Sequence, residues 1–176
     1  SVDEVLKEIE DALRRLKEEV ERVLKENEDE LRRLEEEVRR VLKEDEELLE
    51  SLKRGVGESD EVDRVVDEIA KLSAEILEKV KKVVKEIRDS LETVKRRVDD
   101  VVRRLKELLD EIKRGSDEKA IRDVAKEIRD RLKELEEEIE EVTRRNLKLL
   151  ADLEMSCAQE SEKTRRLLET VLRRAT

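Results

Sequence analysis

Two of the few chemically reactive side chains in this sequence stand close together. Met155 and Cys157 are the only methionine and the only cysteine in 176 residues, and both lie in the segment LEMSCAQESEKTRR. A cysteine nucleophile normally needs a neighbouring base such as histidine, and the sequence contains no histidine. A single cysteine also forms no internal disulfide, which fits a reducing compartment. We therefore expect no catalytic residue and no enzyme activity.

Composition argues against other kinds of functional site. Metal sites in helical bundles use Glu-x-x-His pairs, which a chain without histidine lacks, and there is neither zinc-ligand spacing nor a glycine-rich phosphate loop. Charged residues make up 53% of the chain, with both signs interleaved and a net charge of -10. No basic patch is therefore expected for nucleic acid. No apolar run approaches the roughly 20 residues of a membrane span, and the N-terminus has no apolar signal region. We expect a soluble cytoplasmic or nuclear protein without cofactor, metal, nucleic-acid partner or membrane partner.

Glycines mark the breaks between the elements that position Met155 and Cys157. All three glycines fall in KRGVGESDEV and KRGSDEKA, where basic residues come first and Ser and Asp follow. This order is typical of a helix end followed by a new helix start. It predicts helices over 2–53, 59–113 and 116–175, with Ser1 and Glu4 as a capping box for the first. Each helix would be about 80 Å long at 1.5 Å per residue, and the short connections make neighbours antiparallel.

Each helix carries an internal repeat. LRRLKEEVERVLKENEDE, from Leu13, is followed directly by LRRLEEEVRRVLKEDEEL, from Leu31, a shift of 18 residues. Eighteen residues are five turns at 3.6 residues per turn, so the apolar stripe returns to the same face without drifting. The repeat predicts an all-α, single-chain, antiparallel three-helix bundle over 1–176, nearly straight and monomeric. Self-association of the stripes as a coiled coil is an alternative.

Polar residues interrupt the apolar stripe at matching heights. One predicted layer contains Asn27, Ser90, Thr143 and Asn146, and a second contains Asp45, Ser73, Ser161 and Thr164. Buried hydrogen-bonded layers of this kind fix the register of helices, because a shift would leave polar groups unpaired in an apolar core. Alternatively, some of these side chains face water at the edge of the stripe.

The third repeat of the last helix departs furthest from the pattern. Its six core positions are Cys157, Glu160, Ser161, Thr164, Leu168 and Val171, where the first repeat has Ile121, Val124, Ala125, Ile128, Leu132 and Leu135. Glu160, Ser161 and Thr164 thus replace apolar side chains, while Met155 takes the surface position held by Glu137. Selection for packing alone does not produce this exchange. The segment indicates a requirement other than folding.

Two resemblances suggest what that requirement is. Long capped helices, an aliphatic core without aromatic residues or proline, and a Glu/Lys/Arg surface resemble a de novo designed bundle, a natural spectrin-like or coiled-coil fragment being the alternative. The segment MSCAQES matches the core of the C-terminal degron of ornithine decarboxylase, which delivers its carrier to the proteasome without ubiquitin. Together these features resemble the degron-carrying members of the LOCKR switches, a family of designed proteins in which a separate "key" helix displaces a terminal "latch" helix from a "cage".

The resemblance implies a division of the chain and a set of partners. It implies a cage over 1–153 and a latch over 154–176, with a key helix peptide as partner and the proteasome as a second partner in the open form. The degron residues would be Met155, Ser156, Cys157, Ala158, Gln159, Glu160 and Ser161. Within that family's degron the Cys-Ala pair, here Cys157 and Ala158, is critical. The alternative function is a purely structural designed bundle with buried hydrogen-bond networks.

Overall fold

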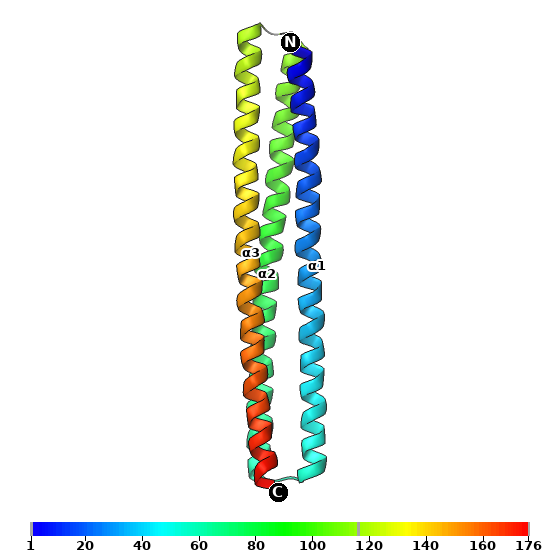
Figure 1. The fold of residues 1–176 in the computed structure, drawn as a ribbon, viewed down its shortest axis with the longest axis vertical. Helices are drawn as coiled ribbons and strands as arrows, with labels where there is room; N and C mark the ends of the chain where they lie inside the picture. Colours follow the sequence, from blue (N-terminus) through cyan, green and yellow to red (C-terminus); the bar gives the residue numbers. More distant parts are fainter. Residues whose placement is uncertain (1, 116, 176) are drawn as a thin grey trace. The chain divides into compact units, whose positions relative to one another are not determined.

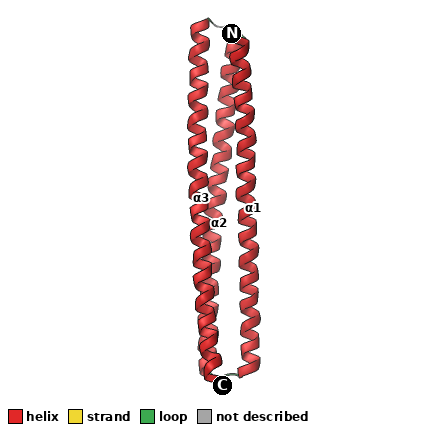
Figure 2. Ribbon diagram, in the orientation of Figure 1, coloured by secondary structure: helices red, strands yellow, loops and turns green. Residues whose placement is uncertain are grey.

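The structure, a computed structural model, describes residues 2–115 and 117–175, with side chains as far as residue 174. It contains three long helices, α1 (Val2–Val56), α2 (Asp60–Lys113) and α3 (Glu118–Ala175). Figure 2 shows these helices joined by two short connections. The predicted capping residue Ser1 and the predicted start of the third helix, Ser116, lie outside the described residues.

The first connection differs from the prediction at the end of α1. We predicted an end at Lys53, but the helix continues through Gly55 to Val56. Val56 packs against the buried cluster of Leu52, Val62 and Val171, and this apolar contact favours an additional helical turn. Gly57 then takes the left-handed conformation, with φ of 79°, and its N–H donates to the Lys53 carbonyl at 3.2 Å.

The starts of α2 and α3 are capped by side-chain oxygens. Ser59 Oγ accepts a hydrogen bond from the Val62 N–H at 3.2 Å, three residues into α2. At the second connection Gly115 has φ of 97°, and Asp117 Oδ1 accepts from the Ala120 N–H at 2.8 Å. Asp117 is therefore the N-cap of α3, and the helix begins at Glu118.

The three helices pack into two compact units. Unit 1 contains Ser1–Glu28 and Ile87–Asn146, and unit 2 contains Asp29–Glu86 and Leu147–Thr176. Each helix contributes one segment to each unit. The colours in Figure 1, which follow the residue number, show where each segment lies along its helix. In each unit the three segments pack against one another, so the fold is an all-α three-helix bundle, as predicted.

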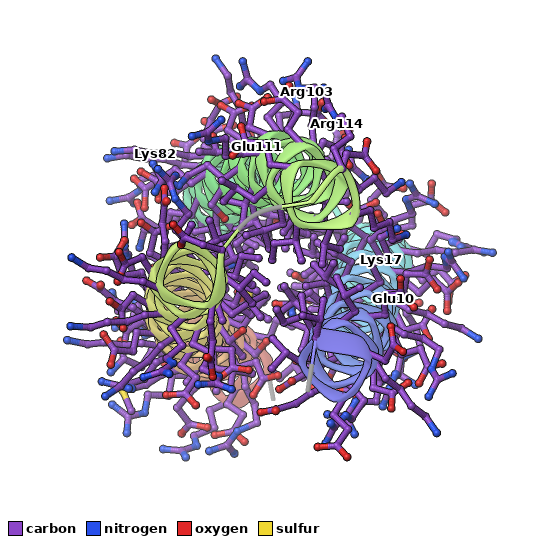
Figure 3. All side chains as sticks on the ribbon, turned by 90° about the horizontal axis from the view of Figure 1, so that it is seen from above. Glu10, Lys17, Lys82, Arg103, Glu111 and Arg114 are labelled. Atoms are coloured by element: carbon purple, nitrogen blue, oxygen red, sulfur yellow. The ribbon has the colours of Figure 1, made fainter. Side chains whose placement is uncertain are left out.

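Ion pairs and a hydrogen bond between helices give the chain directions in unit 1. Lys113 pairs with Glu10 at 3.3 Å and Lys95 with Glu28 at 3.7 Å, so α2 runs antiparallel to α1. Two α2–α3 contacts, Arg97 to Glu138 and Ser90 to Asn146, show that α3 also runs antiparallel to α2. The interior of the unit is aliphatic and includes the fully buried Ile128 and Leu105. The labelled charged side chain of Arg103 projects outward in Figure 3.

Unit 2 has an aliphatic interior that ends in the cluster near the first connection. Leu34, Val38, Ile69, Leu72 and Leu153 are buried along it. At the end of α3, Val171 is buried and Leu168 packs beside it against Leu52 and Val62. The apolar stripe is interrupted where the segment 155–161 of α3 faces the other two helices.

Candidate functional site

The segment 155–161 is helical throughout and lies in unit 2. Met155 is 63% exposed, in agreement with its predicted surface position. Ala158, Gln159 and Ser161 are also exposed, Ser156 and Cys157 are half-buried, and only Glu160 is buried. The Cys-Ala pair is thus held in helical geometry at the edge of the packed face.

In the repeat of α3 that begins at Cys157, the buried face of the helix is turned relative to the repeat that begins at Ile121. Ile121 and Ala125 are buried in unit 1, whereas the equivalent Cys157 is only half-buried and Ser161 is exposed. Glu160 is buried, although Val124 at the equivalent position is only partly so. Since successive residues are about 100° apart around a helix, this exchange moves the buried face by roughly 30–40°. The prediction that Ser161 occupies a core position is therefore wrong: this small polar side chain turns to solvent, and the longer Glu160 points inward.

A cavity of about 290 Å³ lies beneath the segment. Its aliphatic wall consists of Leu34, Val38, Val41, Leu42, Leu72 and Ile76, from α1 and α2. Its polar side includes Cys157, Glu160 and Thr164 on α3, with Asp45 and Ser73 opposite. The cavity exists because short or polar side chains stand where other repeats of the same helices have aliphatic ones. Neighbouring side chains do not close a space of this size without cost.

Glu160 contributes a fully buried carboxylate oxygen without a hydrogen-bond partner to the cavity region. Its side chain is 10% exposed, its Oε2 has no hydrogen-bond partner, and its Oε1 lies 3.9 Å from Lys163 Nζ. Lys163 is itself largely exposed, so this contact screens the carboxylate only weakly. A buried carboxylate oxygen without a donor costs about 1–3 kcal/mol or more.

Burial and negative neighbours also act on Cys157 and Asp45. Burial, together with the carboxylates of Glu37, Glu154 and Glu160, raises the pKa of the Cys157 thiol above its usual range, although Lys79 opposes this. Burial and then Glu44 raise the pKa of Asp45. The thiol is therefore less nucleophilic than an exposed cysteine at neutral pH.

The first predicted polar layer is partly joined by hydrogen bonds. Ser90 Oγ lies 3.1 Å from Asn146 Oδ1 and 2.8 Å from the Ile87 carbonyl oxygen, and its single proton can serve only one of them. Asn146 is 1% exposed and its Nδ2 has no partner. Turning this amide by 180° would let Nδ2 donate to Ser90 Oγ while the hydroxyl donates to Ile87. Asn27 is also buried, but its Nδ2 donates to Val23 in its own helix at 2.7 Å.

The remaining predicted network residues are not joined across helices. Thr143 is half-buried, and no side-chain hydrogen bond of Thr143 is formed among the described residues. Asp45 and Ser73 are half-buried and Thr164 is buried, yet within the described part of the chain none of their side chains forms a hydrogen bond. The predicted second layer therefore faces the cavity as separate polar groups, with Ser161 at its exposed edge.

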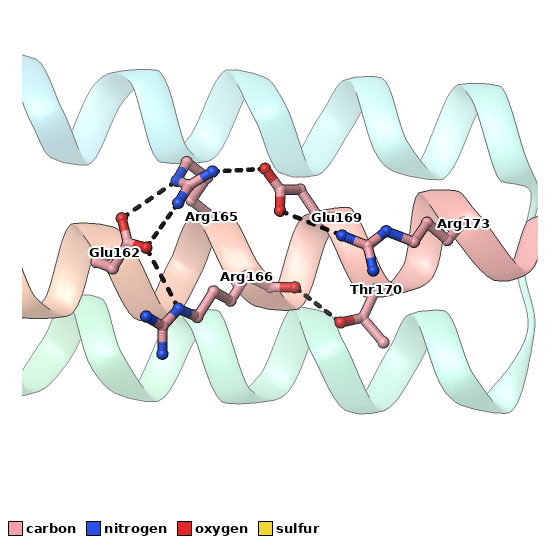
Figure 4. Close-up of polar contacts among 6 residues, drawn as sticks. All are labelled: Glu162, Arg165, Arg166, Glu169, Thr170 and Arg173. Carbon is pink, nitrogen blue, oxygen red and sulfur yellow. Dashed lines mark hydrogen bonds and ion pairs between the residues drawn. The ribbon is translucent and has the colours of Figure 1, made fainter.

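After the segment, α3 continues as a helix bearing a ladder of exposed ion pairs, drawn in Figure 4. Arg165 bonds Glu162 and Glu169, each at 2.6 Å, and Arg166 reaches Glu162 at 3.2 Å. These contacts lower the pKa of Glu162 and raise that of Arg165. Such i,i+3 and i,i+4 pairs support a helix by only a few tenths of a kcal/mol each. At the end of α3, Arg174 also pairs with Glu61 of α2.

The described residues contain neither a cluster of metal ligands nor a helix suited to span a membrane. In residues 2–115 and 117–175, no group of three or more Cys, Asp or Glu side chains is arranged to hold a metal ion. None of the described helices combines the length and apolar character of a membrane span. No protein-family model, curated protein or solved structure matches the chain.

Sequence reasoning identified the segment but missed the cavity. The contribution of Leu34, Val38 and Leu72 to one void depends on how three helices meet, which a single-helix template does not contain. The loss of apolar side chains at Glu160 and Thr164 was the available signal, because large-to-small or apolar-to-polar exchanges in a core leave unfilled space.

Proposed function

We propose that the chain is a switch that keeps a proteasome-targeting segment packed within α3 and exposes it when a separate helix displaces the end of α3. We keep the name latch for residues 154–176. The observation that carries the proposal is that MSCAQES coincides with an interruption in the packing of α3, above a cavity of about 290 Å³. Sequence matching a degron thus stands where the helix is held less tightly.

The closed state prevents recognition in this proposal because Cys157 and Ala158 are held in a helix. A receptor that reads an extended segment needs the backbone free and the thiol accessible, whereas here the helix is continuous and Cys157 is half-buried. Once released, about 20 residues fray readily, since short isolated helices are marginal in water.

The energy available to a key helix can be compared with what it must overcome. A latch held in the same chain competes at an effective concentration of roughly millimolar, so a micromolar key must gain about a thousandfold, or about 4 kcal/mol. A key with Val at the position of Glu160 and Ile at that of Thr164 would bury two aliphatic side chains, each worth about 1.5–3 kcal/mol. The expected gain of about 3–6 kcal/mol spans this requirement, so a key opens the latch when both side chains are well buried.

The test is the half-life of a fluorescent protein fused to the N-terminus of the chain, in cells that contain proteasomes. Co-expression of an α3 peptide carrying Glu160→Val and Thr164→Ile should shorten the half-life, and a proteasome inhibitor should restore it. Leu168→Ala with Val171→Ala should shorten the half-life without a key, because both side chains hold the latch against the Leu52 and Val62 cluster.

Cys157→Ala provides the control for recognition. It should leave the fold nearly unchanged, at a cost of about 1 kcal/mol, while blocking turnover of the opened chain. If the latch-weakened chain is long-lived, or is degraded equally fast with Cys157→Ala, then MSCAQES does not act as a degron and the chain is a structural bundle.

A further inference from the structure

The cavity in unit 2 has the properties of a small-molecule site. Its volume of about 290 Å³ lies near the lower end of the roughly 300–1,000 Å³ typical of ligand pockets. Exposed residues, among them Ala158, Ser161 and Glu37, also line it, so it reaches the surface beside α3. An aliphatic wall with a few converging polar groups is the usual lining of such pockets.

The polar side of the cavity selects for positive charge. The ionisable side chains that line it are Glu37, Asp45, Glu154, Glu160 and the thiol of Cys157, and its described lining includes no lysine or arginine. Glu160 Oε2 is buried without a donor, and the nearby Lys163 approaches only the other oxygen, at 3.9 Å. A ligand cation would be attracted by these carboxylates, whereas an anion would be repelled by them.

The cavity also offers acceptors for the remaining hydrogens of a cation. The hydroxyls of Ser73 and Thr164 line it and form no hydrogen bond among the described residues. A primary ammonium carries three N–H donors, which matches one carboxylate oxygen and these hydroxyl oxygens. The aliphatic wall would take up a hydrocarbon body, because burying apolar surface there removes it from water.

We propose that this cavity binds a small primary ammonium compound with a compact aliphatic body, whose ammonium pairs with the Glu160 carboxylate. The ligand occupies the packed form of α3 and not the displaced one. On the proposed function, it therefore holds the switch closed, with a shift of about a hundredfold toward the closed form at a ligand concentration 100 times Kd.

The test uses the purified chain and three probes with the same ring: cyclohexylammonium, cyclohexanol and cyclohexanecarboxylate. Cys157 lines the cavity and is the only thiol, so its rate of alkylation, followed by mass spectrometry, reports occupancy. Cyclohexylammonium should slow alkylation saturably, cyclohexanol should bind about tenfold more weakly, and cyclohexanecarboxylate should have no effect. Calorimetric titration should give the same order of affinities.

Glu160→Gln should lower the affinity for cyclohexylammonium about tenfold and leave the affinity for cyclohexanol unchanged. The matched control Glu136→Gln removes one charge from an exposed position of α3 and should change neither. Ser73→Leu, which fills the cavity, should abolish both, and the denaturation midpoint of each variant establishes that it is folded. The proposal is overturned if no probe protects Cys157, if all three bind equally, or if Glu160→Gln leaves the cation's affinity unchanged. These outcomes involve no proteasome, so they are distinct from failure of the proposed switch.

Discussion

Replacing Glu160 with leucine should stabilise the protein, although it alters the segment that matches a degron. The native side chain is 10% exposed and leaves one carboxylate oxygen without a donor, which costs about 1–3 kcal/mol. Leucine would remove that cost and place apolar surface in the cavity, and full burial of such a side chain contributes about 1.5–3 kcal/mol. Loss of the 3.9 Å contact with exposed Lys163 subtracts at most about 1 kcal/mol. The expected gain in unfolding free energy is therefore about 1.5–6 kcal/mol.

Guanidinium denaturation followed by circular dichroism measures this gain as a higher midpoint at unchanged slope. Hydrogen exchange should place the added protection in the parts of α1, α2 and α3 that surround the cavity. Gln159→Leu is the matched control, since it adds leucine at the exposed neighbouring residue and should change stability by less than about 0.5 kcal/mol. An unchanged or lower midpoint for Glu160→Leu would show that the carboxylate is satisfied in solution, and the energetic account of the latch would then be wrong.

Three further predictions concern the other polar groups. Burial raises the pKa of Asp45 in the folded protein, so its contribution to stability is greatest below the ordinary aspartate pKa and is lost as pH rises through the raised pKa. Asp45→Asn should therefore raise the thermal midpoint at pH 7 and change it little below roughly pH 4. Replacing Asn27 and Asn146 together by leucine should raise the unfolding free energy by about 1–3 kcal/mol in urea titrations, since each has an unpartnered buried amide atom; a loss would indicate an intact network. Iodoacetamide should alkylate Cys157 at pH 7.5 more slowly than a cysteine moved to exposed position 159 in a Cys157→Ala background, because its raised pKa lowers the thiolate fraction; equal rates would contradict the described burial.

The fold could be predicted because several local features agree with one another. The 18-residue repeat and the glycine-containing breaks fix three helices, and short connections fix their directions. The end of α1 was misplaced because Gly55 was taken as the stop, whereas the repeat itself continues to Val56, which the apolar cluster holds. A glycine indicates where a helix can end, but packing decides which of two neighbouring glycines ends it.

The site was predicted less completely because it depends on how α3 is turned. The repeat of six core positions makes Ser161 equivalent to Ala125. The buried face of α3 is turned by roughly 30–40° at this height, however, so Ser161 is exposed and Glu160 is buried. The same limit applies to the polar layers. Counting residues along antiparallel helices correctly placed Ser90 beside Asn146, but it could not show that Asn27 donates a hydrogen bond within its own helix. These outcomes depend on side-chain reach and on neighbouring helices.

The void beneath the latch also makes the closed form sensitive to hydrostatic pressure. Space that packing leaves empty in the folded chain is lost when helices separate and water fills it, so unfolding reduces the volume of the system, by roughly 20–100 mL/mol in typical proteins. The cavity beside Cys157 and Glu160 opens to the surface, so only the share of its roughly 290 Å³ that water does not fill adds to the volume change when α3 is released. Compression should therefore favour the displaced latch at constant temperature and without any added helix.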